Sequence, residues 1–402
     1  TQDVQKYMRE VIHLIEAHPL IKVYTRATIE SINGKVGNFQ TTLMSGNGHK
    51  EQTVLEHGVV IVATGGKENK PTEYLYGQDD RVMTNLELEE RIINADEKLI
   101  NSQSLVMIQC VGCRQEDRNY CARICCNQSI KNDLKLKKIN PQMDIYILFR
   151  DIRTYGFAED YYREASDNDV KFIRYEPDDK PRVEAVEHEG RSVLRVVVTD
   201  PILGKQLAID ADHLSLAAAV IPLASNSEIA QFFKVSLGPD EFFKEAHVKL
   251  RPVEFSTEGV YLCGLAHYPK HIPESINQAY GAASRALTLL SHDTVTVSGS
   301  ICEVNEMACM GCGACISACT YGAIEFRETK QGKKAVVNPV ICKGDGLCNV
   351  KCPTGAIYLK HFTDQEIICQ VDAAVPEEDT RKQPKAAVEK VAKFVWNREE
   401  QK

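Results

Sequence analysis

The sequence predicts an α/β protein followed by a smaller α+β module. Two observations support this prediction. Residues 104–150 alternate an apolar strand, a helical segment and a second apolar strand, as in a parallel α/β unit. Residues 309–324 (CMGCGACISACTYGAI) recur at 342–357 (CKGDGLCNVKCPTGAI) with a period of 33, which indicates an internal duplication.

Composition excludes several classes of protein. The chain has 402 residues and a formal net charge of −8, so we expect two or three domains and no nucleic-acid partner. No run of 18 apolar residues and no apolar leader occurs, so the sequence predicts a cytoplasmic protein without a membrane span. Its fifteen cysteines are clustered, which in such a chain favours metal or redox centres over a disulfide framework.

The remaining elements can be predicted in chain order. Residues 20–62 combine β-forming residues with glycine turn signals and predict a small meander that ends in a buried strand. After the α/β unit, a strand within 253–267 and a helix opened by Pro273 at its first position are expected to return to the first domain.

Beyond residue 376 the chain is rich in charged residues, and a short apolar stripe follows helical spacing beside the only tryptophan. The stripe comprises Val388, Val391, Ala392, Val395 and Trp396. Two interpretations remain open, a solvated terminal helix and a docking helix for another polypeptide of an assembly.

The first copy of the repeat has the spacing CxxCxxCxxxC, at Cys309, Cys312, Cys315 and Cys319. In this motif three thiolates bind one iron-sulfur cubane and the fourth binds a neighbouring one. A structural zinc site normally pairs its ligands across a longer spacer, so zinc is disfavoured. The repeat therefore predicts a ferredoxin-like module with two clusters.

The second copy departs from the motif, because Asp345 stands where its second cysteine is expected. The crossed arrangement assigns one cluster to Cys309, Cys312, Cys315 and Cys352, and the other to Cys342, Cys348 and Cys319. A carboxylate is a harder ligand than a thiolate, so both an Asp345-ligated four-iron cluster and a three-iron cluster remain open. Cys302 and Cys369 lie outside the spacing, and we expect them to be small buried residues.

A second group of cysteines lies in the α/β unit. Cys110 and Cys113 follow the strand LVMIQ, where a dinucleotide-binding unit would have GxGxxG, so this turn lacks a phosphate cradle. Cys121, Cys125 and Cys126 are predicted on the following helix, facing the same loop. We favour a four-iron cubane; a redox disulfide, a zinc or other non-cubane site, and buried free cysteines are the alternatives. Spacing does not decide which of the five cysteines is spare.

Two strand-to-helix turns are candidate flavin contacts. They comprise Ala63, Thr64 and Gly65 in VIVATGG, Gly264 and Leu265 in GVYLCGLAH, and Pro273 and Ser275 at the following helix start. The positive end of that helix would face the pyrimidine end of the flavin ring. The chain contains no GxGxxG, so either residues outside it hold the flavin pyrophosphate or no flavin binds. No proton-transfer role is assigned to His267 or His271.

Several long strings make the chain resemble the A-type subunit of heterodisulfide reductase over residues 1–365. They are QCVGCRQEDRNYCARICC, FRDIRTYGFAEDYYREA, VTDPILGKQLAIDAD, EAHVKLRPVEFSTEGVYLCGLAH and the duplicated cysteine segment. The resemblance implies a thioredoxin-reductase-like scaffold of two dinucleotide-binding domains, the second with an iron-sulfur cluster, and then a two-cluster ferredoxin module. The expected parts are 1–98 and 216–292 for the FAD domain, 99–215 for the inserted domain, 293–365 for the ferredoxin module and 366–402 for the tail.

The resemblance also implies cofactors and ligands. The position of Cys113 is commonly serine in this family, which implies Cys110, Cys121, Cys125 and Cys126 as ligands, and hence three clusters besides FAD. The chain departs from the family at Asp345, and at Leu265, where related disulfide reductases have a flavin-contacting acid. The glycine-rich FAD loop is also absent, so a split form or a fragment is expected.

The implied function is that of an oxidoreductase subunit that relays electrons between FAD and [4Fe-4S] clusters, with electron bifurcation to ferredoxin and a disulfide acceptor. The implied partners are B- and C-type subunits, a hydrogenase or a formate- or NADH-dehydrogenase-type input subunit, ferredoxin, and a chain that completes the FAD site. Two alternatives are a polyferredoxin-like relay without flavin and an NAD(P)H-dependent flavin oxidoreductase similar to the small subunit of glutamate synthase. The second requires a phosphate-binding loop in the second domain, and VGCRQE is not one.

Overall fold

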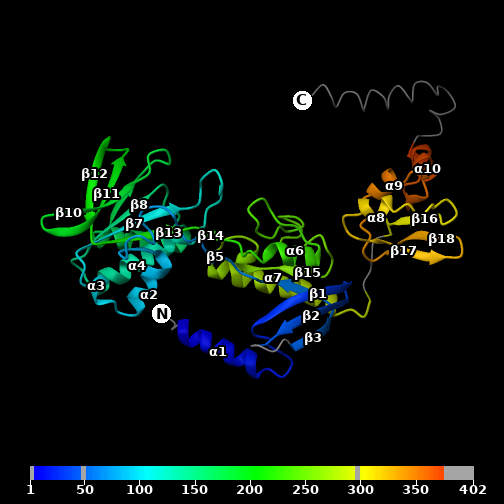
Figure 1. Ribbon diagram of the computed structural model, residues 1–402, viewed down its shortest axis with the longest axis horizontal. Coiled ribbons are helices and arrows are strands. Elements are labelled where there is room, and N and C mark those ends of the chain that lie inside the picture. The colour runs from blue at the N-terminus through cyan, green and yellow to red at the C-terminus, as the bar shows by residue number, and fades with distance from the viewer. Residues whose placement is uncertain (1–3, 47–50, 295–298, 375–402) are drawn as a thin grey trace. The chain divides into compact units, whose positions relative to one another are not determined.

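The computed structural model describes residues 4–46, 51–294 and 299–374. The chain divides into two units, Thr1–Ser291 and His292–Lys402, which are described separately. Figure 1 labels their helices and strands. The predicted tail stripe, from Val388 to Trp396, lies outside the described residues.

The first unit contains a five-stranded parallel sheet (Figure 1). Its order is β6 (Val82–Thr84), β13 (His213–Ala218), β7 (Ser104–Val111), β8 (Asp144–Phe149) and β9 (Lys171–Arg174). Helix α4 (Cys125–Ile139) connects β7 to β8, and α5 (Glu159–Asp167) connects β8 to β9. Strand β7 is buried along almost its whole length, as expected for a central parallel strand. The predicted parallel α/β unit is confirmed.

Smaller elements complete this part of the chain. Helices α2 (Asn85–Ile93) and α3 (Glu97–Ile100) follow β6, and α2 packs against α4. Thr84 and Glu87 form a capping box at the start of α2. Between β9 and β13 the chain forms an antiparallel sheet of β10 (Arg182–His188), β11 (Arg191–Asp200) and β12 (Lys205–Ala211). The 3-10 turn η1 (Gly156–Ala158) precedes α5.

The segments before and after the α/β unit are joined by pairing between strands that are distant in sequence. The predicted meander is an antiparallel sheet of β1 (Ala27–Lys35), β2 (Asn38–Ser45) and β3 (Glu51–His57), which follows α1 (Val4–Ala17). Next, β4 (Val60–Val62) pairs in parallel with β15 (Val260–Leu262), and β5 (Lys67–Glu68) pairs with β14 (Val220–Ile221). Helix α6 (Asn226–Phe233) precedes β15, and the 3-10 turn η2 (Gly264–Ala266) follows it.

Helix α7 (Ile272–Leu290) packs against both β4 and β15, so the late strand and helix do rejoin the first segment. The helix begins at Ile272, so Pro273 occupies its second position, one residue later than the sequence predicted. Proline fits there because the first-turn N–H groups have no partner within the helix.

The second unit is an α+β module with internal two-fold repetition. Strand β16 (Cys302–Val304) pairs with β19 (Ile357–Leu359), and β17 (Ile324–Thr329) pairs with β18 (Gly332–Val337). Helices α8 (Ala314–Ala318) and α9 (Leu347–Lys351) pack against each other, and α10 (Asp364–Ala374) follows. The repetition extends to atomic detail. A Cβ at Gly311 would lie 2.4 Å from the carbonyl oxygen of Lys333, and a Cβ at Gly344 would lie 2.2 Å from that of Ser300. Only glycine fits at either turn.

Among the residues that the structure describes, no helix is long and apolar enough to cross a membrane.

Candidate functional site

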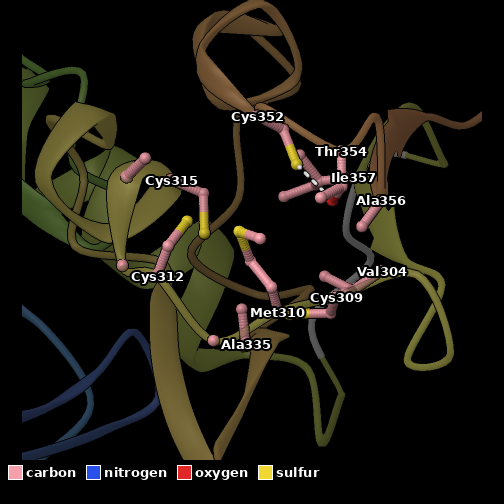
Figure 2. A pocket seen from close by; sticks show the side chains of 13 residues that line it. Val304, Cys309, Met310, Cys312, Cys315, Ala335, Cys352, Thr354, Ala356 and Ile357 are labelled. Carbon is pink, nitrogen blue, oxygen red and sulfur yellow. Dashed lines mark hydrogen bonds between the residues drawn. The ribbon is translucent and has the colours of Figure 1, made fainter.

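Four cysteines of the second unit line one pocket. They are Cys309, Cys312, Cys315 and Cys352, the set expected to hold the first cluster. Figure 2 shows the side chains of Cys312, Cys315 and Cys352 directed toward one shared space. Ala335 and Ile357, both buried, close the pocket with apolar surface. The crossed spacing thus places a cysteine of the second repeat beside three of the first.

This pocket suits a thiolate-bound cluster. Burial opposes ionisation of Cys352, but hydrogen bonds from the Thr354 hydroxyl and nearby backbone N–H groups lower the pKa of its thiol. Within the described residues, no three His, Cys, Asp or Glu side chains lie close enough to bind a single metal ion. Four thiols around one pocket match the ligand set of a four-iron cubane.

The three cysteines of the second ligand set all contact the buried core of this unit. Cys342 and Cys319 are half-buried and Cys348 is buried. Asp345 is exposed, and its Oδ1 accepts a hydrogen bond from the N–H of Leu347 at 3.1 Å. Cys302 is buried, as predicted, and its thiol contacts Cys348. The prediction for Cys369 is wrong, because this cysteine is exposed on α10.

The cysteine group of the first unit lies at the carboxyl end of β7. Cys110 belongs to the strand, and Cys125 and Cys126 form the first turn of α4. Together with Cys113 they belong to one buried core of packed side chains, which also contains Ala217 and Val220. Our prediction that Cys121 shares a helix face with Cys125 is wrong, because Cys121 precedes the helix in an irregular segment. A left-handed Arg123 (φ 61°) interrupts any helix between the two.

The thiols of this group already interact in pairs. Cys113 donates to Cys110, and this bond, together with the Arg114 guanidinium 3.8 Å from the Cys110 sulfur, outweighs burial and lowers the pKa of Cys110 to about 6. The same contact, together with burial, raises the pKa of Cys113. Cys125 donates to Cys126 in the same way and lowers the pKa of Cys126. The thiolate is the form that binds iron, so any ligand among these cysteines must lose its proton on binding.

The candidate flavin contacts lie at the carboxyl ends of two paired parallel strands, β4 and β15. This edge of a parallel sheet is where ligands bind in such folds. Gly65 and Gly264 both have positive φ, and no atom lies within 4 Å of the position a Cβ would take at either. Ala63 and Thr64 belong to the first turn, and the Thr64 hydroxyl donates to Asn226 at 3.1 Å.

The start of α7 carries unsatisfied polar atoms beside these turns. Ser275 Oγ and His271 Nε2 are both buried and have no hydrogen-bond partner among the described residues. Buried polar atoms of this kind normally have a partner, so a ligand with polar atoms fits here. With the open space at the two glycines and the positive end of α7, the residues present fit part of a flavin site.

Leu265 joins the flavin turn to the cysteine group. It lies in η2, and it packs against the buried apolar core that the four cysteines form with Ala122, Ala217, Ala219 and Val220. A Cβ at Gly66 would lie 3.7 Å from that of Leu265, so the turn after β4 reaches the same place. An apolar side chain therefore lies at this turn, beside the core that contains the cysteines.

A polar network supports the turn after β15. Gln278 accepts from the N–H of Gly264 at 3.0 Å and donates to His267 Nδ1 at 2.7 Å, while His267 Nε2 bonds to Glu245 at 2.9 Å. Lys270 Nζ donates to the carbonyl oxygen of Gly264 at 2.6 Å. Burial, with repulsion from Arg123, lowers the pKa of Lys270 to about 8. Sequence reasoning missed Gln278 and Lys270, because neither belongs to a recognisable motif.

Comparisons with known proteins identify the cysteine repeat and relatives of the chain. Residues 308–356 match the family model for a 4Fe-4S dicluster domain. The chain is 38% identical over 351 residues to one of the A-type iron-sulfur subunits of CoB–CoM heterodisulfide reductase from Methanopyrus kandleri, which covers 81% of this chain and 51% of that protein. It is 38% identical over 345 residues to the A-type subunit of the H2:CoB-CoM heterodisulfide,ferredoxin reductase of Methanothermobacter thermautotrophicus, which covers 82% of this chain and 51% of that protein.

The chain thus spans about half the length of the curated relatives it matches. Among solved structures, thioredoxin reductase of T. acidophilum matches with a TM-score of 0.45 and 15% identity, over 73% of this chain and 81% of that one. Thioredoxin reductase of Lactococcus lactis matches with a TM-score of 0.46 and 14% identity, over 71% and 81%.

Proposed function

The chain belongs by sequence with the A-type subunits of heterodisulfide reductase, and we propose that it is an oxidoreductase subunit that relays electrons between FAD and iron-sulfur clusters. One observation supports this proposal more than any other. Leu265, in the turn after β15, packs against the buried apolar core that contains the cysteines of the first unit. A flavin at this turn and an iron-sulfur cluster at these cysteines would therefore contact the same apolar core.

In this proposal Ala63, Thr64, Gly65, Gly264, Leu265, Pro273 and Ser275 contact the flavin, and Cys110, Cys121, Cys125 and Cys126 bind the adjacent cluster. When bound, FAD supplies two-electron chemistry and each four-iron cluster supplies one-electron chemistry. The chain's own residues position these groups. The start of α7 presents partial positive charge, and the glycines leave room for close approach of the backbone.

The first unit also excludes water from the cysteine end of this path. Cys110, Cys113, Cys125 and Cys126 are all at most 6% exposed, and Val220 and Ala219 fill the space around them. Low solvent exposure and hydrogen bonds to sulfur are among the factors that set a cluster's potential. The Arg114 contact with Cys110 is one such interaction.

Further parts of the proposal concern the assembly. The names of the matched relatives specify H2 or formate, CoB–CoM heterodisulfide and ferredoxin. We propose corresponding partners here: B- and C-type subunits, a hydrogenase or a formate- or NADH-dehydrogenase-type input subunit, ferredoxin, and a polypeptide segment that supplies the FAD pyrophosphate loop. Electron bifurcation at the flavin is the most specific form of this proposal.

The test is a kinetic comparison of two buried cysteine variants in the assembled complex. Cys125→Ser removes a proposed ligand, and Cys113→Ser removes the proposed spare at a similarly buried position. After rapid mixing with reductant, flavin absorbance and cluster signals are followed separately. We expect the C-terminal clusters of the Cys125→Ser assembly to be reduced several-fold more slowly than those of the Cys113→Ser assembly. Equal rates in the two assemblies would contradict the relay.

A further inference from the structure

The second cluster site of the C-terminal unit lacks one cysteine at its motif positions. Cys342, Cys348 and Cys319 are present, and Asp345 occupies the remaining position. The corresponding residue of the first repeat is Cys312, which lines the first pocket. A four-iron cluster has four irons to ligate, so this site needs a ligand from elsewhere or a carboxylate.

Cys302, outside the motif, lies beside two of these three cysteines. Its Sγ is 3.3 Å from that of Cys348, and its backbone N–H donates to the Cys342 sulfur at 3.4 Å. Cys302 is 2% exposed and belongs to the same buried hydrophobic core as Cys348. Cys302 therefore lies next to cysteines of the second ligand set, although it is not part of their sequence motif.

The duplication indicates what this position does. Cys302 and Ala335 are 33 residues apart, so Ala335 is the equivalent of Cys302 in the second repeat. Their pairing partners, Leu359 and Phe326, are also 33 residues apart. Ala335 lines the first cluster pocket beside Cys309, Cys312 and Cys315. By the same internal symmetry Cys302 faces the second cluster position, with a thiol where the first site has a methyl group.

Asp345 is the weaker candidate for the fourth ligand. Its carboxylate is exposed, and one of its oxygens already caps the N–H of Leu347 at the start of α9. A carboxylate is also a hard ligand, whereas iron-sulfur clusters select soft thiolates. A buried thiol next to two cysteine ligands meets the requirement better than an exposed carboxylate does.

We propose that Cys302 is the fourth ligand of the second cluster, replacing the cysteine that is absent at position 345. This inference rests on the proposed function, in which this unit binds two clusters. Binding requires the Cys302 thiol to release its proton to solvent as the sulfur–iron bond forms, with no change in oxidation state. The second site would then be a complete four-thiolate [4Fe-4S] site.

The test uses Cys302→Ala, Asp345→Ala and the double variant Cys302→Ala with Asp345→Cys, each in the anaerobically purified full chain. Alanine is sterically suitable at 302 because its equivalent, Ala335, is buried in the same environment. Iron content and electron paramagnetic resonance spectra are the readouts. We expect Cys302→Ala to lose one iron, with a three-iron signal, or the whole second cluster. Asp345→Ala should keep the wild-type spectrum, and the double variant should regain the four-iron cluster.

Two results would overturn the inference. One is a Cys302→Ala variant that keeps all its iron and a four-iron spectrum at the second site. The other is a wild-type chain that already shows a three-iron cluster there. The first cluster serves as an internal control in every variant. Its absence from the wild-type chain would contradict the two-cluster assignment itself, which distinguishes failure of the proposed function from failure of this inference.

Discussion

The guanidinium of Arg123 donates a hydrogen bond to the carboxylate of Glu274 at 2.6 Å, which joins the cysteine loop of the first unit to the first turn of α7. Arg123 also donates to the carbonyl oxygen of Pro269 and to the hydroxyl of Tyr155. Glu274 caps the helix by accepting from the N–H of His271 at 3.0 Å. The candidate cluster and the candidate flavin contacts are therefore held together by a polar tether as well as by Leu265.

Breaking this tether should affect cofactor retention more than overall stability. Both side chains are about one-third exposed, so Arg123→Ala should lower the free energy of unfolding by only about 1 kcal/mol or less. We expect it nevertheless to speed flavin release from the assembled protein several-fold, because the start of α7 loses its contact with the cysteine loop. Flavin fluorescence after dilution measures this rate. Arg163→Ala, which breaks an exposed pair on α5, is the matched control, and equal release rates would contradict the role of the tether.

The choice of spare cysteine in the first unit is testable by iron content. Cys125→Ser should remove one cubane, because it deletes a proposed ligand at the first turn of α4. Cys113→Ser should leave the iron content unchanged, because the resemblance to the A-type subunits implies that Cys113 is the spare cysteine. The comparison needs only iron analysis and visible absorption of the two purified variants. The reverse pattern would show that Cys113 is a ligand.

Cluster loss in one unit should not affect the other. Cys312→Ala deletes a thiol from the first pocket of the C-terminal unit, and we expect one ferredoxin-type cluster to be lost or converted to a three-iron form. The cluster of the first unit should remain, because the two units have separate cores. Electron paramagnetic resonance separates the signals. Unchanged iron and spectra would count against the ligand assignment.

A buried carboxyl in α4 predicts a specific pH dependence. Burial raises the pKa of Asp133 to about 8, and neither of its oxygens has a partner among the described residues. Between its unfolded pKa near 4 and this value the unfolded chain binds fewer protons, so this group makes the fold less stable as pH rises. Above pH 8 its effect is constant. Asp133→Asn should therefore be more stable than wild type by about 1–3 kcal/mol at pH 8, with the gain fading toward pH 4.

Thermal or denaturant unfolding of the first unit across this pH range checks the prediction. Asp167→Asn, at the exposed end of α5, is the control and should not reproduce the pH-dependent gain. A constant difference between Asp133→Asn and wild type at all pH values would contradict the assigned cause.

Local patterns in the sequence predicted much of the fold, because they report directly on packing. The apolar run at 104–111 became the central buried strand β7, and the meander within 20–62 formed as β1–β3. Spacing within the repeat also predicted that Cys352 would join Cys309, Cys312 and Cys315. Such motifs constrain both backbone turns and side-chain direction within a few residues.

Other features depended on tertiary contacts that no local pattern contains. Cys121 fell outside α4 because Arg123 adopts a left-handed conformation, and the hydrogen bonds of Arg123 to Glu274 and Pro269 only exist once α7 has docked. Similarly, the proximity of Cys302 to Cys348 depends on the pairing of β16 with β19. Contacts between distant segments are set by the whole fold. The sequence alone therefore predicted only that Cys302 is a small buried residue.

The account's central claim is that this chain places a flavin beside an iron-sulfur cluster and connects them to a two-cluster module. The most direct test is to measure flavin and iron per mole of chain in the anaerobically isolated native assembly, with co-purifying polypeptides identified by mass. Three four-iron clusters predict about twelve irons, with one FAD, together with a polypeptide segment that contains a GxGxxG loop. Iron at this level without any flavin would contradict the claim and leave a cluster relay alone.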